Sequence, residues 1–345
     1  MGSGAGTAEA SSTGTGGGSP LSRPWTLRDI PLAVRLSFDL EKLGTGALGL
    51  TAAALAYGAF DWLGARTGER AAHRIFAALG ALLATCLCVL FSGLIARMVT
   101  TQLLEERRAG AAEIREFLRR RWSTLIGIPL AFGGFALLML GLEAMLALVG
   151  AIPGVGPLVY SSSFLLAFSL SLTAVLTVAV HMIGAFFYPA IVAIRGVGAV
   201  GAILEVIELA RRKPLYVIIY EGVMGAVGAV MTFIIGAAVW ASLNLTVFLG
   251  GAIMGDAFTQ TSSQVPDFFR VFLRPFARLL PLQAEQVEAA WHYDLSGILL
   301  GGSLMVVVVL ALVYPFVFFT SAGSIAYLIL RTEPAPPELS PIEDL

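Results

Sequence analysis

Charged residues are scarce in this sequence and absent from long parts of it. Only 13% of its 345 residues are Asp, Glu, Lys or Arg, and none of these four occurs between Glu143 and Arg195. An average soluble protein has about 25% charged residues, and no soluble core uses so many long apolar runs. The shortage of charge therefore excludes a soluble globular domain and indicates a chain that lies mostly in a membrane.

Residues that hold metals or carry catalysis are also few. Cys86 and Cys88 lie two positions apart in one apolar segment, so they point to different helix faces and predict neither a disulfide nor a metal site. The three histidines, at positions 73, 181 and 292, are far apart in the chain. The HExxH, GxSxG, Walker A and CxxC motifs do not occur. We expect no enzymatic activity, no metal or other cofactor, and no nucleic-acid partner.

Six apolar stretches in the sequence are long enough to cross a bilayer, for which a helix needs roughly 20 residues. The predicted spans are 44–63, 75–96, 123–148, 159–187, 215–243 and 295–322. This pattern predicts an all-α polytopic membrane protein with six transmembrane helices in three hairpins and with interfacial amphipathic helices. The fourth and sixth stretches are longer than a simple span, and Pro189 and Pro315 are the expected helix breaks.

The two ends of the sequence differ in composition from its apolar middle. Residues 1–24 are rich in Gly, Ser and Thr and predict a disordered tail, and residues 331–345 form a second tail rich in Pro and acidic residues. Residues 25–330 form the predicted membrane domain, with hairpin units at about 28–98, 102–195 and 198–330.

The distribution of basic residues predicts the orientation. With six spans, one side of the membrane receives 16 Lys and Arg and the other side receives 6. Cytoplasmic loops carry the excess of basic residues, so both termini are expected in the cytoplasm. Twenty arginines against two lysines are consistent with a high-GC genome, and we expect a bacterial inner-membrane protein.

Two loops on the predicted cytoplasmic side have similar sequences. Residues 113–121 (EIREFLRRR) and 205–213 (EVIELARRK) align without gaps at an offset of 92, and residues 30–43 form a weaker third copy. Apolar positions between acids, followed by a basic triplet, are typical of an amphipathic helix at a membrane surface. Duplication of a unit made of an interfacial helix and a hairpin explains the match. The match is explained equally well without duplication, because any helix that enters the membrane from the cytoplasm tends to have basic residues at that end.

Residues 188–196 (YPAIVAIRG) and 202–214 (AILEVIELARRKP) resemble a family of bacterial polytopic proteins. This family includes the membrane domains found beside glycerophosphodiester phosphodiesterases, and the resemblance extends over about residues 97–250. It implies a long helix that ends at a proline, a short turn with glycine, and an amphipathic helix before the next span. Where the relatives often have Glu, this chain has Arg195. The resemblance implies an architecture and not a specific activity.

Three ionisable residues lie well inside predicted spans, where charge is costly and each such residue is by default a functional candidate. His181 and Glu221 are both expected about 10 Å from the inner surface and could form a proton-linked pair. A hydrogen-bonded clasp between helices is the more common role of such residues. Glu143 lies nearer the outer surface, where it is either protonated or in contact with water.

Arginines gather in three places on the predicted membrane surfaces. Arg270, Arg274 and Arg278 recur every four residues in the fifth loop, so on a helix they share one face. A site for a lipid or an anionic ligand is one interpretation, and an anchoring helix with snorkelling arginines is the other. The basic residues at the entrances of the third and fifth spans predict contacts with anionic lipid heads. They are Arg119, Arg120, Arg121, Arg211, Arg212 and Lys213.

These features favour a non-enzymatic membrane scaffold or lipid-contacting component, with membrane lipids as its expected partners. The alternative is a transporter of a lipid or small amphipathic solute, coupled to protons through His181 and Glu221. The two hypotheses differ over whether these side chains meet in a wet cavity or pack in a dry one.

Overall fold

The computed structural model describes residues 26–332 except 154, 267 and 270–290, and these residues form helices and no strand. In chain order the helices are the 3-10 helix η2 (Leu27–Asp29), α1 (Leu32–Ser37), α2 (Leu40–Arg66), α3 (Arg70–Leu104), α4 (Ala111–Gly150), α5 (Gly156–Ser162), α6 (Phe164–Gly184), α7 (Tyr188–Arg195), α8 (Ala199–Arg212), α9 (Pro214–Met254), α10 (Asp256–Ser263) and α12 (Trp291–Thr332).

Six of these helices, α2, α3, α4, α6, α9 and α12, are long and apolar enough to cross a membrane. The predicted all-α fold with six spans is confirmed, and the chain is a multi-pass membrane protein. The fourth span differs from its predicted range, because α5 and α6 are separate helices and α6 ends at Gly184. Helices α4, α9 and α12 have 40, 41 and 42 residues, about 60 Å at 1.5 Å per residue, and extend beyond a bilayer core of about 30 Å.

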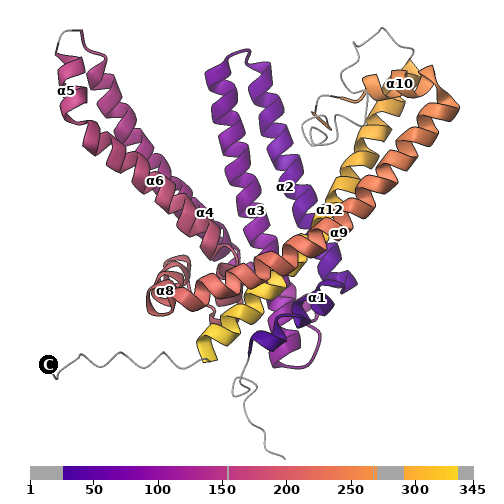
Figure 1. Ribbon diagram of the computed structural model, residues 1–345, viewed down its shortest axis with the longest axis horizontal. Helices are drawn as coiled ribbons and strands as arrows, with labels where there is room; N and C mark the ends of the chain where they lie inside the picture. The colour runs from indigo at the N-terminus through magenta and orange to yellow at the C-terminus, as the bar shows by residue number, and fades with distance from the viewer. Residues whose placement is uncertain (1–25, 154, 267, 270–290, 333–345) are drawn as a thin grey trace, which may run out of the picture.

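The six spans form three hairpins that meet at one end of the molecule and spread apart toward the other (Figure 1). Helix α2 packs on α3, α4 on α6, and α9 on α12. Glycines allow close contact within the first hairpin: a Cβ at Gly49 would lie 2.5 Å from the Cβ of Phe91. We call the end where the hairpins meet the base. It contains α1, α7 and α8, the last turns of α3 and α12, and the first turns of α4 and α9.

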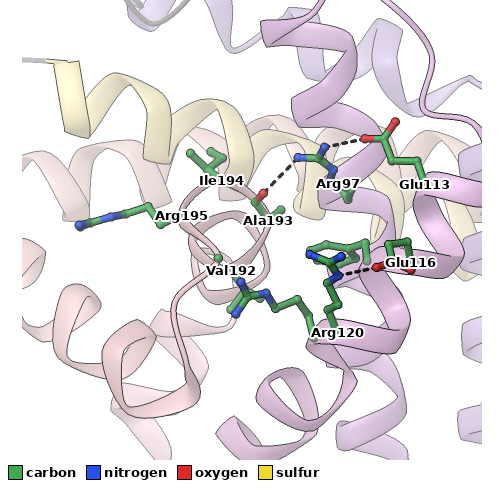
Figure 2. Close-up of a pocket in the computed structure, with 11 residues that line it drawn as sticks. Arg97, Glu113, Glu116, Arg120, Val192, Ala193, Ile194 and Arg195 are labelled. Atoms are coloured by element: carbon green, nitrogen blue, oxygen red, sulfur yellow. Dashed lines mark hydrogen bonds and ion pairs between the residues drawn. The ribbon is translucent and has the colours of Figure 1, made fainter.

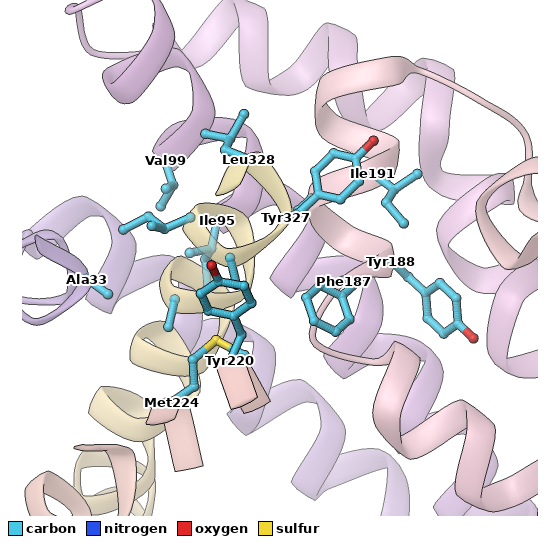
Figure 3. Packing of buried hydrophobic residues seen from close by; sticks show 14 of the residues in the cluster. Ala33, Ile95, Val99, Phe187, Tyr188, Ile191, Tyr220, Met224, Tyr327 and Leu328 are labelled. Carbon is cyan, nitrogen blue, oxygen red and sulfur yellow. The ribbon is translucent and has the colours of Figure 1, made fainter. Parts of the chain in front are cut away.

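The main apolar core lies at the base (Figure 3). Helix α12 is buried almost completely over its last turns, from Ala322 to Leu330, where it contacts α1, α3 and α7. Large apolar side chains nearer the opposite ends of the hairpins are exposed, among them Phe233 at 76% and Ile253 at 81%. Exposed apolar side chains on long membrane helices face lipid, so the base holds the hairpins together while their other ends contact the bilayer.

The chain turns sharply between α7 and α8. Helix α6 ends before Tyr188, and α7 begins there with Pro189 in its first turn, a position where proline is tolerated. Gly196 ends α7 in the left-handed conformation, with φ +62°, which glycine adopts without steric strain. The axes of α7 and α8 then differ by 117°. By contrast, Pro315 lies inside α12, so the sixth span does not break there.

The two similar loop sequences do not form the same structure. Residues 205–213 form the later part of α8 and its C-cap, and α8 is a separate amphipathic helix that buries Ala202 and Val206 and exposes Arg211 and Arg212. The expected surface helix at residues 113–121 is instead the start of α4, continuous with the third span. Pro214 starts a new helix after Lys213, whereas no helix breaker separates Arg121 from the residues that follow it.

Candidate functional site

A pocket of about 400 Å³ opens at the base between α3, the first turns of α4 and the end of α7 (Figure 2). Its lining contains four arginines and two glutamates, beside apolar residues of the last turn of α7. The charged lining residues are Arg97, Arg120, Arg121, Arg195, Glu113 and Glu116. The pocket therefore combines residues of three helices, α3, α4 and α7, and its lining has more positive than negative groups.

Glu113 is the centre of an ion-pair network on one side of this pocket. Its carboxylate lies 2.5 Å from Arg97 Nη2 and 2.8 Å from Arg107 Nη1. Glu105 pairs with the same two arginines. The hydrogen bonds to Glu113 and Glu105 raise the pKa of Arg107 above its ordinary value. The network ties the end of α3 to the start of α4, and Arg97 also donates to the Ala193 carbonyl at the end of α7.

Glu116 lies on the same helix and has two partners of its own. Arg119 and Arg120 donate to its two carboxylate oxygens at 2.8 and 2.5 Å. The third basic residue of this triplet, Arg121, has no ion pair or hydrogen bond within the described part of the chain. Its guanidinium lies against Gly196, where a Cβ would be 2.7 Å from Arg121 Nη2. Arg121 is thus a half-buried cation that no carboxylate among the described residues neutralises.

Glu205 joins three helices on the other side of α7. From α8 it pairs with Arg195 of α7 at 3.0 Å, and it accepts a hydrogen bond from the hydroxyl of Tyr327 of α12. Tyr327 is 1% exposed. Glu205 and Glu113 occupy equivalent positions of the two similar sequences, and each accepts from an arginine of the preceding helix.

The six basic residues at the span entrances do not share one role. Arg119, Arg120 and Arg212 are 76%, 71% and 66% exposed as side chains, and Arg211 is also exposed. Lys213 is instead buried at 8% exposure, and its ammonium donates to the Leu330 carbonyl at 2.7 Å. The expectation that Lys213 contacts lipid heads is therefore wrong. Its ammonium satisfies one of the carbonyls that the end of α12 leaves without an intrahelical partner.

The structure does not bring His181 and Glu221 together. Both ring nitrogens of His181, on α6, are buried without a hydrogen-bond partner among the described residues, and so is Oε1 of Glu221 on α9. His181 packs between aromatic rings, with centroid distances of 5.0 Å to Phe132 and 6.1 Å to Tyr188. The expected proton-linked pair does not form, because α6 packs mainly on α4 and the His181 ring faces α4 and α7 rather than α9.

Glu143 has a partner within its own hairpin. The hydroxyl of Ser171, on α6, donates to Glu143 Oε2 at 2.5 Å. The contact joins α4 to α6, so the carboxylate acts as a polar clasp between membrane helices.

The outer arginines Arg270, Arg274 and Arg278 lie outside the described residues. Within residues 26–332, apart from the stretches named above, no three His, Cys, Asp or Glu side chains gather closely enough to hold a metal ion. No family model, curated protein or solved structure matches this chain. The charged base is therefore interpreted from its own geometry.

Sequence reasoning singled out the basic triplets but missed the groups that organise them. Arg97 could have been noticed, because it is the one charged residue between Arg74 and Glu105, and an isolated charge in an apolar segment is a candidate site. The contact between Glu205 and Tyr327 joins residues 122 positions apart, and no local pattern indicates it.

Proposed function

We propose that this protein is a non-enzymatic bacterial inner-membrane component whose base lies at the cytoplasmic surface and contacts anionic lipid heads. The observation that carries the proposal is the group of exposed arginines at the entrances of α4 and α9. Arg119 and Arg212 are 76% and 66% exposed, at the end of the molecule where both described chain termini lie. Each basic residue near an anionic surface contributes about 1 kcal/mol.

The packing around the base supports a scaffold rather than a moving transporter. The apolar core and the networks of Glu113 and Glu205 join all three hairpins at this end. A proton-coupled carrier requires a titrating pair that one side of the membrane can reach. His181 and Glu221 do not form that pair. Stable attachment at a lipid surface requires only a rigid base with exposed cations.

The test is the lipid that stays with the protein after mild solubilisation. We expect the native chain to retain phosphatidylglycerol over phosphatidylethanolamine, relative to the membrane from which it is extracted. Replacing Arg119, Arg211 and Arg212 together by Gln removes three contacts of about 1 kcal/mol each and should reduce this enrichment at least fivefold. The three side chains are exposed, so the fold should be unaffected. Retained lipid of bulk composition in the native protein contradicts the proposal.

A further inference from the structure

The pocket at the base has more positive charge than its own carboxylates neutralise. Its lining has four arginines and two glutamates. Glu113 is engaged by Arg97 and Arg107, and Glu116 by Arg119 and Arg120. The ion-pair partners outside the lining are two cations and two anions: Arg107, Arg119, Glu105 and Glu205. Their charges cancel, so the excess of two positive charges in the lining remains.

The excess charge centres on Arg121. Glu205, which lies outside the lining, neutralises Arg195, whereas Arg121 has no partner among the described residues. A guanidinium presents five N–H donors in a planar fork. Because Arg121 is half-buried, solvent screens its charge less than it screens the exposed Arg119 beside it.

The backbone at the end of α7 leaves this guanidinium accessible. Gly196 lies directly against Arg121 Nη2, and a Cβ at this position would lie 2.7 Å from it, so a side chain there would displace the guanidinium. Arg120 lines the same pocket from the preceding position. A volume of about 400 Å³ admits a small anionic group, and Val192, Ala193 and Ile194 complete the lining on the side of α7.

We propose that this pocket binds a phosphate group, with Arg121 as the principal donor and Arg120 at the rim. A phosphate monoester carries about −1.5 to −2 charges near neutral pH, which matches the excess of two positive charges. Guanidinium groups bind phosphate oxygens through two parallel hydrogen bonds. The group comes from a lipid head or from free phosphate, and the lipid source rests on the proposed function.

Isothermal titration of the purified full-length protein in a neutral detergent tests the site with two probes, inorganic phosphate and dihexanoyl phosphatidic acid. We expect the native protein to bind at least one. Arg121→Gln should weaken binding at least tenfold, equivalent to about 1.4 kcal/mol. Arg119→Gln is the matched control, since Arg119 belongs to the same triplet but does not line the pocket, and it should bind within twofold of the native protein.

The ratio of the two affinities identifies the source. Phosphatidic acid bound at least tenfold tighter than phosphate assigns the site to a lipid head, and similar affinities assign it to free phosphate. Thermal melting shows whether Arg121→Gln is folded. If that variant does not fold, Arg120→Gln tests the site instead, because Arg120 is exposed and its replacement should not disturb the fold. Its removal leaves the negative charge of Glu116 facing the pocket, which should weaken binding at least threefold.

Failure to bind either probe, or unchanged binding by the folded variants, overturns the pocket site. The proposed function is judged separately, from the lipid retained by the variant lacking Arg119, Arg211 and Arg212. None of these three residues lines the pocket. Anionic lipid retained without probe binding would refute the phosphate site alone.

Discussion

Glu205 is the residue through which α7, α8 and α12 are joined at the base. Its carboxylate pairs with Arg195 and accepts from the buried hydroxyl of Tyr327. Without the carboxylate, the Tyr327 hydroxyl would be buried without its acceptor, and an unsatisfied buried donor costs about 1–3 kcal/mol. Arg195 is 48% exposed and can be solvated by water, so most of the loss should come from Tyr327.

We predict that Glu205→Ala lowers the free energy of unfolding by about 1–3 kcal/mol, measured by chemical unfolding in detergent. Glu208→Ala provides the control on the same helix. Glu208 pairs with Arg212 at the surface, where both side chains are more than half exposed, and such pairs contribute about 0–1 kcal/mol. Equal effects of the two substitutions would show that Glu205 is not a structural link.

At the scale of elements, the corner between α7 and α8 sets the position of the pocket. Helix α7 has six buried residues among its eight, and the residues at its end line the pocket. The corner depends on Gly196, which has a positive φ and lies against Arg121. A side chain there would require a strained backbone conformation, and the guanidinium of Arg121 would have to move aside.

We predict that Gly196→Ala destabilises the protein by about 1–2 kcal/mol because of the left-handed conformation, while the flexible end of Arg121 can move aside at little cost. Thermal unfolding of the purified protein measures the effect. Gly198→Ala is the control from the same turn, because Gly198 has a negative φ and a Cβ added to it would meet nothing within 4 Å. A Gly196 variant as stable as the Gly198 variant would refute the role assigned to this glycine.

The sequence allows the long elements to be predicted, but not their contacts. Apolar length alone indicates six spans, and the positions of Pro189 and Pro214 indicate where helices begin, because proline is tolerated in the first turn. The similar sequences at 113–121 and 205–213 were misleading, since only the second precedes a proline and forms a helix of its own. Apolar periodicity cannot distinguish a surface helix from the first turns of a span.

The charged residues show the same limit within the candidate site. Lys213 and Arg211 belong to one basic triplet, yet one is buried against the Leu330 carbonyl and the other is exposed. This difference in burial depends on where α12 ends, more than 100 residues later in the chain. Likewise, equal depth in the membrane suggested that His181 and Glu221 pair, but depth does not determine which hairpins are neighbours.

At the scale of the whole molecule, the hairpins join at the base and separate elsewhere (Figure 1). Even close to the base, His181 and Glu221 do not pair with each other. We predict that proteoliposomes carrying the protein show no proton flux above empty vesicles under an imposed pH gradient, measured with an enclosed pH-sensitive dye. His181→Ala and Glu221→Gln should leave the signal unchanged. Flux in the native protein that both folded variants lose would support the transporter instead.

The most direct test of the central claim is whether the base touches anionic lipid. Trp122 is 53% exposed beside the basic triplet, so it can report contact if the other four tryptophans are replaced by Phe. In vesicles of equal brominated-lipid content, we predict stronger quenching of Trp122 fluorescence by brominated phosphatidylglycerol than by brominated phosphatidylcholine. The difference should disappear when Arg119, Arg120 and Arg121 are replaced by Gln. Equal quenching of the native protein by both lipids would contradict the claim.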